Sequence, residues 1–252
     1  MTPLPILRVY RDSAEVATAV ADQFFDVLTS VLAEGSDSVA HISLTGGTMG
    51  GKVLREVAES SRRSDIDWSR VHFWWSDERY LLLGDPDRNE TQSREALLDE
   101  LRLSEAQIHG MPALGADPSL EDAAHSYRDE LAVFSVKDHA WPRFDILLLG
   151  VGGDGHIASL FPGHALLHDT EHIVLAEADS PKPPSARITL TLPVINSADR
   201  IWCVLTGADK AHALQSALSG GDVDETPAAG VRARLETVFF ADNAAAEALA
   251  TE

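Results

Sequence analysis

A histidine closes a glycine-rich segment, Gly150–His156, which reads GVGGDGH. An imidazole has an ordinary pKa of about 6.5, so it can accept a proton near neutral pH and act as a general base. Asp154 could orient the ring and stabilise its charged form, and Asp77 or Glu78 could do the same. The pattern indicates acid–base chemistry with His156 as the base, and it leaves the choice of carboxylate partner open.

A second glycine-rich segment, Thr45–Gly51, suits an anion. Glycines let the backbone approach a ligand closely, and the free N–H groups at the start of the next helix attract negative charge. Lys210 could add positive charge, and Arg187 could hold a phosphate through two parallel hydrogen bonds. These residues together predict a site for a phosphate monoester.

Two nucleotide-binding motifs are matched only in part. The glycines of Gly150–Gly155 fit G-x-G-x-x-G, but Asp154 places a negative charge where a pyrophosphate would lie, and Pro162 leaves little room for the usual helix. The segment Gly46–Lys52 fits G-x-x-x-x-G-K, but Val53 stands where a hydroxyl would hold Mg²⁺. Neither a dinucleotide nor a nucleoside triphosphate is therefore expected.

A metal site is also disfavoured. His156, His164 and His168 lie near one another in sequence, but no cysteine and no H-E-x-x-H pattern accompanies them. We expect neither a metal nor a cofactor.

The elements that would position these residues alternate along the chain. Apolar, β-rich runs predict strands, and apolar residues at helical spacing predict helices. The expected strands are Val39–Leu44, Val71–Trp75, Phe144–Leu149, Arg187–Leu190, Arg200–Leu205 and Thr237–Phe240. The expected helices are one from Val16 to Val31 capped by Asp12, then Gly50–Ala58, Thr91–Leu101, Leu120–Phe134, Asp209–Leu218 and an alanine-rich terminal helix capped by Asp242.

This alternation predicts an α/β fold with an open, mostly parallel sheet and helices on both faces, as a single domain over residues 1–252. Polar loops follow four strands, and they begin at Thr45, Ser76, Gly150 and Thr206. Because the carboxyl ends of parallel strands share one edge of a sheet, where ligands bind, we expect these loops to form one site.

Composition and charge exclude several classes of protein. The formal net charge is −20, and no cluster of Lys and Arg appears, so binding to nucleic acid or to an anionic membrane is not expected. The chain has one cysteine, Cys203, and shows neither a secretory signal nor an apolar run of membrane-spanning length. A cytoplasmic protein, monomeric or a small homo-oligomer, is the expectation.

The sequence also resembles the 6-phosphogluconolactonases of the glucosamine-6-phosphate isomerase/deaminase superfamily. The strongest segment is Phe144–Gly163, FDILLLGVGGDGHIASLFPG, and Leu44–Thr48 (LTGGT) and Trp75–Arg79 (WSDER) are further matches. Arg187–Asn196 and Thr206–Leu214 resemble the C-terminal signatures. The matches follow one another in order over nearly the whole chain.

The resemblance implies a Rossmann-like fold and hydrolysis of 6-phosphoglucono-1,5-lactone in the oxidative pentose phosphate pathway, without a cofactor. His156 would be the general base and Asp154 its support. The substrate would be bound by Gly46, Gly47, Thr48, Asp77, Arg79, Asn89, Arg187 and Lys210.

Two alternatives remain. Ile157 is the residue found in the deaminase branch, which would act on glucosamine 6-phosphate. In that branch an acidic residue in the following segment serves ring opening. Here the segment Ser159–Gly163 has no acidic residue, and this favours the lactonase. A sugar-phosphate-binding protein without activity is the second alternative, although pure binding would need no base.

Overall fold

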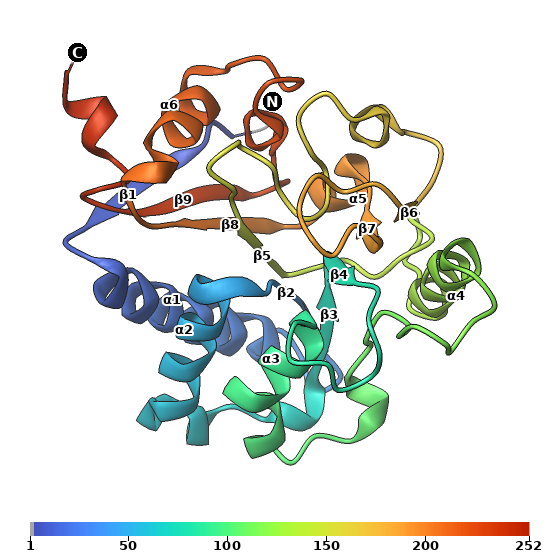
Figure 1. The fold of residues 1–252 in the computed structure, drawn as a ribbon. Helices are drawn as coiled ribbons and strands as arrows, with labels where there is room; N and C mark the ends of the chain where they lie inside the picture. Colours follow the sequence, from blue (N-terminus) through green and yellow to red (C-terminus); the bar gives the residue numbers. More distant parts are fainter. Residues whose placement is uncertain (1–2, 252) are drawn as a thin grey trace.

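The computed structural model describes residues 3–251, and its centre is a six-stranded parallel sheet (Figure 1). The first strand along the chain pairs with the last, because β1 lies at one edge of the sheet beside β9. In spatial order the strands are β1 (Ile6–Tyr10), β9 (Glu236–Asp242), β8 (Arg200–Leu205), β5 (Ile146–Gly150), β2 (Ala40–Leu44) and β3 (Val71–Trp75).

Helices cover both faces of this sheet, as the sequence predicted. One face packs against α1 (Ser13–Ala33), α2 (Gly47–Glu59) and α3 (Asn89–Ala96). The other packs against α4 (Leu120–Val133), α5 (Leu192–Asn196) and α6 (Ala211–Ser219).

Strand β5 shows why its sequence is continuously apolar. Side chains alternate between the two faces of a strand. Ile146 and Leu148 enter the core beneath α1 and α2, whereas Leu147 and Leu149 enter the core on the opposite face. Because both faces are buried, a polar residue at any of these positions would lose its contact with water without gaining a partner.

A second, three-stranded sheet was not predicted. It is antiparallel and consists of β4 (Asp77–Arg79), β7 (Arg187–Leu190) and β6 (Val174–Glu177). The expected strand at Arg187–Leu190 does form, but it lies in this small sheet and not in the parallel one. Strand β4 has the sequence Asp-Glu-Arg, which lacks the apolar alternation that marks a strand.

Helix α1 begins as predicted. Asp12 accepts hydrogen bonds from the backbone N–H groups of Ala14 and Glu15. Within the described residues, α1 is the one helix long and apolar enough to cross a membrane by length and composition. Its apolar face is instead buried against the sheet, from Val16 to Leu32, so α1 serves here as a core helix.

Two predicted helices differ from the structure. The helix expected at Thr91–Leu101 ends at Ala96, because the backbone of Leu97 leaves the helical region, and a short 3-10 helix follows. Among the described residues no α-helix follows Asp242, so the terminal helix expected there is present only as a short 3-10 helix. Asp242 ends β9, its carboxylate accepts the N–H groups of Gly207 and Ala245, and a 3-10 helix begins at Glu247.

Three histidines, His41, His72 and His109, cluster near the amino ends of β2 and β3, away from the carboxyl edge of the sheet. His72 Nδ1 lies 2.8 Å from His109 Nε2, and His109 Nδ1 lies 2.6 Å from the carboxylate of Glu130. Trp74 donates its indole N–H to His41 Nδ1. Burial lowers the pKa of all three histidines, and that of His41 falls to about 3.

Acidification should therefore destabilise the fold through these histidines. Their pKa values are lower in the folded state than the ordinary value near 6.5, so the unfolded chain binds more protons below that pH. The stability that their neutral forms contribute is complete above about pH 6.5 and is lost as the pH falls. For His41 the loss between about pH 7 and pH 5 should be roughly 2 kcal/mol.

Urea unfolding of the His41→Gln variant tests this, because glutamine keeps an acceptor for Trp74 but does not titrate. The variant should lose less stability than the wild type between the two pH values. Replacing the exposed His125 by glutamine is the control. Equal pH dependence in the wild type and the His41 variant would contradict the prediction.

Candidate active site

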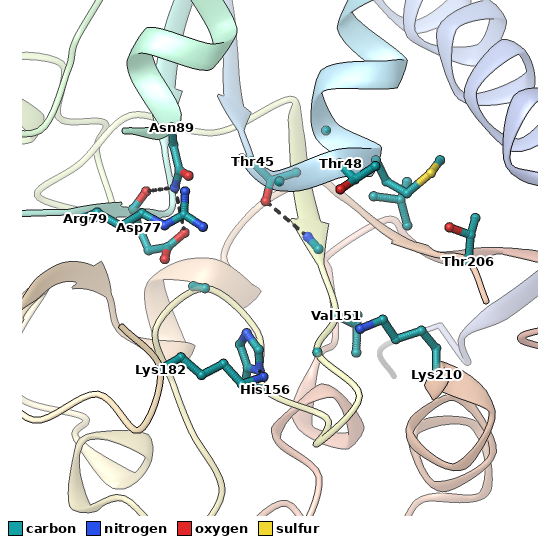
Figure 2. Close-up of a pocket in the computed structure, with 18 of the residues that line it drawn as sticks. Thr45, Thr48, Asp77, Arg79, Asn89, Val151, His156, Lys182, Thr206 and Lys210 are labelled. Carbon is teal, nitrogen blue, oxygen red and sulfur yellow. Dashed lines mark hydrogen bonds between the residues drawn. The ribbon is translucent and has the colours of Figure 1, made fainter. Parts of the chain in front are cut away.

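The four polar loops meet at the carboxyl edge of the parallel sheet, where they surround a cavity of about 450 Å³ (Figure 2). Each loop contributes to the wall, and so does the segment that contains Lys182 and Arg187. The lining residues are Thr45–Gly50, Asp77, Arg79, Asn89, Gly150–Gly152, His156, Ala158, Lys182, Arg187, Val204, Thr206, Asp209 and Lys210. The arrangement expected from strand ends is the one observed.

The cavity has a different charge from the rest of the chain. Four cationic side chains, Arg79, Lys182, Arg187 and Lys210, face two acidic ones, Asp77 and Asp209. The chain as a whole carries a formal charge of −20. The positive side chains of the cavity therefore attract an anion, although the chain as a whole is negatively charged.

Asp154 is the carboxylate that contacts His156. Its Oδ1 makes a short hydrogen bond with His156 Nδ1, and the imidazole side chain is 18% exposed. The other two candidates are occupied elsewhere. Asp77 accepts a hydrogen bond from Ser159, and Glu78 accepts backbone N–H groups. The partner that the sequence left open is thus Asp154 in the structure.

The turn that carries His156 has no room for larger residues. A Cβ atom on Gly152 would lie 1.9 Å from His156 Nδ1 and 2.3 Å from Asp154 Oδ1. Gly155 has φ of +82°, and a Cβ there would meet Thr226 at 2.7 Å. After this turn the backbone makes bridges and turns, with no helix until a short 3-10 helix at Ala165, which agrees with the rejection of dinucleotide binding.

Lys182 is a cavity residue that was not among the predicted site residues. Its Nζ lies 3.0 Å from Asp154 Oδ2 and 3.0 Å from His156 Nδ1. Burial would raise the pKa of Asp154, but the hydrogen bonds with His156 and Lys182 outweigh burial and hold that pKa below its usual range. Asp154 is therefore a carboxylate at neutral pH.

The start of α2 forms the opposite wall. Gly46 caps this helix in an extended conformation and no side chain caps it, while Gly47 N–H donates to Gln92 Oε1 at 3.2 Å. The N–H groups of a first helical turn have no acceptor within the helix. Thr48 lies at this wall, and Lys210 extends toward the cavity beside Val151 (Figure 2). This end of the cavity has the donors that a phosphate requires.

Asp77, Asn89 and Arg187 lie together, but most of their polar atoms already have partners. Asn89 Nδ2 donates to the backbone oxygen of Asp77 at 2.8 Å. Its Oδ1 is buried without a hydrogen bond, close to Gly46, where a Cβ would lie 1.8 Å from it. Asn89 therefore fixes the distance between the α2 cap and β4, besides any contact with substrate.

The guanidinium of Arg187 hydrogen-bonds to the loop that precedes β7. Its Nε donates to the carbonyl oxygen of Pro184 at 3.1 Å and its Nη2 to that of Lys182 at 3.2 Å. Nη1 lies 3.9 Å from Asp77 Oδ2. The predicted two-bond phosphate clamp would require the guanidinium to give up these loop contacts, so Arg187 in this structure orders the segment that presents Lys182.

Glu78 is buried and links two elements of the site. It accepts the N–H groups of Arg79, Asn89 and Glu90, so it joins β4 to the start of α3. Burial raises the pKa of Glu78 to about 7, although Arg88 and these N–H groups favour its charged form. Arg79, held above it, lines the cavity and donates to the carbonyl oxygen of Asp87 at 2.6 Å.

The structure does not bring the histidines of this region together as metal ligands. His164 contacts Glu177 and His168 contacts Asp224, whereas His156 contacts Asp154. Within residues 3–251 there is no group of three His, Cys, Asp or Glu side chains arranged to hold a metal ion.

Comparisons with known proteins agree on one family. The family model described as glucosamine-6-phosphate isomerases/6-phosphogluconolactonase matches residues 11–240. The 6-phosphogluconolactonase of Streptomyces coelicolor is 45% identical, with 99% of this chain and 96% of that protein covered. That of Mycobacterium leprae is 38% identical, with 95% and 96% covered. The structure of 6-phosphogluconolactonase from Trypanosoma cruzi has the same fold, with a TM-score of 0.85, 23% identity and coverage of 99% and 98%.

Proposed function

The chain belongs to the glucosamine-6-phosphate isomerase/6-phosphogluconolactonase family, and on that premise we propose how its cavity works as the active site of a lactonase. The activity is hydrolysis of 6-phosphoglucono-1,5-lactone to 6-phosphogluconate, a step of the oxidative pentose phosphate pathway. We infer that His156 is the general base. The observation that carries this inference is that His156 lines the cavity across from the start of α2 and is hydrogen-bonded to Asp154.

The substrate binds with its phosphate at the start of α2. The backbone N–H groups there, at Gly46, Gly47 and Thr48, donate hydrogen bonds to the phosphate oxygens, and Lys210 pairs with their charge. Arg79, Asp77, Asn89 and Arg187 contact the sugar or shape the wall around it. This placement leaves the lactone carbonyl carbon, C1, beside His156.

Hydrolysis then needs one proton acceptor. Because Asp154 accepts the Nδ1 proton, the lone pair of His156 lies on Nε2. His156 takes a proton from water while the water oxygen bonds to C1 and the carbonyl electrons move to the oxygen. The tetrahedral intermediate collapses, the ring oxygen leaves with the C1–O bond electrons, and it receives the proton from His156. A lactone is an activated ester, so no cofactor or covalent nucleophile is required.

Lactone hydrolysis followed by proton release, measured against the spontaneous rate, tests the function. Fresh lactone should give acid much faster with the enzyme than without it. Glucosamine 6-phosphate is the comparison substrate, because ammonia release from it would indicate the deaminase reaction. Binding of 6-phosphogluconate with no acceleration would indicate a binding protein and would contradict the proposal.

Replacing Lys210 by methionine should weaken substrate binding more than it slows the chemistry. A hydrogen bond to a charged group contributes about 1.5–3 kcal/mol, so we expect KM to rise roughly 10- to 100-fold with kcat nearly unchanged. Steady-state kinetics check this. The Lys137→Met variant removes an exposed charge elsewhere and should behave like the wild type. An unchanged KM would place the phosphate elsewhere.

We further infer that the enzyme acts in the cytoplasm on a small phosphorylated substrate, without nucleic acid or membrane partners. The net charge of −20 and the single buried cysteine support this placement.

A further inference from the structure

Lys182 lies beside the proposed base, and the mechanism above does not use it. Its ammonium is 3.0 Å from both Asp154 Oδ2 and His156 Nδ1. Among the described residues it is the cavity cation that contacts His156. Figure 2 shows the two side chains next to each other, apart from Thr48 and from Lys210. A role in the chemistry at C1 is therefore open to Lys182 but not to Lys210.

The proton positions around His156 decide what Lys182 does in the free enzyme. Nδ1 lies against the Asp154 carboxylate, and two lone pairs at that short distance would repel, so Nδ1 carries the proton. Nδ1 is then unable to accept a proton from Lys182. The ammonium must instead donate to Asp154 Oδ2, the carboxylate oxygen that is not hydrogen-bonded to His156.

This resting position is unfavourable during the reaction. When His156 takes a proton from water, the ring becomes a cation, and an ammonium 3.0 Å from Nδ1 repels it. At the same time a negative charge develops on the oxygen attached to C1. A cation that moves from Asp154 to that oxygen relieves the repulsion and stabilises the new charge.

The loop around Lys182 allows this movement of the side chain alone. Its backbone is held, because Arg187 donates to the carbonyl oxygens of Lys182 and Pro184, and Ser180 Oγ hydrogen-bonds with both the carbonyl oxygen and the N–H of Lys182. The side chain itself is 42% exposed, and its ammonium has room to turn toward the cavity that it lines.

We propose that Lys182 is a catalytic residue that leaves Asp154 when substrate binds and donates a hydrogen bond to the carbonyl oxygen of the lactone. This rests on the proposed function. The C1=O electrons that move to oxygen during attack by water are stabilised there by the ammonium. They return to re-form the C=O bond when the ring oxygen leaves. In the product, Lys182 pairs with the C1 carboxylate.

The Lys182→Met variant tests the proposal, since methionine has similar length but no charge. Loss of one donor to an oxyanion lowers kcat by roughly 10²- to 10³-fold, and that is the expected result. Lys182→Arg should recover part of the rate. Lys137→Met is the matched control at an exposed position and should hydrolyse the lactone at the wild-type rate.

Ligand binding separates a catalytic role from a positioning one. Inhibition by 6-phosphogluconate, which has a C1 carboxylate, should weaken at least about tenfold in Lys182→Met. Inhibition by D-glucitol 6-phosphate, which has an uncharged C1 hydroxyl, should stay within about twofold of the wild type.

If Lys182 only held Asp154 in place, kcat would fall while both inhibitors bound as before, and the proposal would be overturned. A normal kcat in Lys182→Met would overturn it as well. Failure of the wild-type protein to accelerate lactone hydrolysis is a separate result, because it would contradict the proposed function itself.

Discussion

Replacing His156 by alanine should lower kcat by roughly 10²- to 10⁴-fold and leave the affinity for 6-phosphogluconate within a few-fold of the wild type. In the proposed mechanism the imidazole contacts the reacting water, whereas phosphate binding depends on the start of α2 and on Lys210, which line the same cavity. Steady-state hydrolysis of fresh lactone gives kcat, and calorimetric titration with 6-phosphogluconate gives the affinity.

The control for this variant is a histidine of the same region without a place in the cavity wall. His168 fits, because its side chain is 61% exposed and it pairs with Asp224 on the surface. The His168→Ala variant should keep the wild-type kcat. A His156→Ala variant that hydrolyses the lactone at a near-normal rate would remove His156 from the role of base.

Adding one methyl group at Gly152 should be nearly as damaging. A Cβ atom there would lie 1.9 Å from His156 Nδ1 and 2.3 Å from Asp154 Oδ1, so both side chains must move. A displacement of about 1 Å in a catalytic group can lower the rate roughly 100-fold, and we expect that loss in kcat for Gly152→Ala. The phosphate end of the cavity is not touched, so KM should change little.

Gly35→Ala is the matched glycine variant. The nearest atom to its new Cβ would be Ser38 Oγ at 3.4 Å, which is an ordinary contact, and kcat should not change. Circular dichroism and the urea midpoint of Gly152→Ala would show whether the fold survives. A folded Gly152→Ala protein with full activity would mean that the Asp154–His156 geometry is not needed for catalysis.

The sequence predicted the parallel sheet well because its central strands are buried on both faces. The run from Phe144 to Leu149 needs apolar residues at every position, and that pattern is hard to mistake. The small antiparallel sheet has no such signal. Its strand β4 consists of charged residues, and β7 has only four residues, in which polar and apolar side chains alternate. Strand β1 lies at an edge and is partly exposed, so its pattern is weak as well.

The part of the site that was predicted from the sequence is the part formed by loops at the ends of the parallel strands. The loops at Thr45, Gly150 and Thr206 meet because the strands before them are parallel neighbours. Lys182 was missed because its contact depends on a loop that reaches the sheet edge from outside the parallel sheet. That loop is ordered by Arg187, and no spacing rule in the segment Ser180–Pro184 indicates where its lysine points.

The pairing of β1 with β9 has a consequence for synthesis of the protein on the ribosome. The N-terminal strand cannot find its partner until residues 236–242 have been made, because β9 lies between β1 and β8. The nascent chain must therefore carry Ile6–Tyr10 as an unpaired, largely apolar segment until β9 has been made. Completion of the sheet therefore follows the synthesis of β9, the strand that bridges β1 and β8.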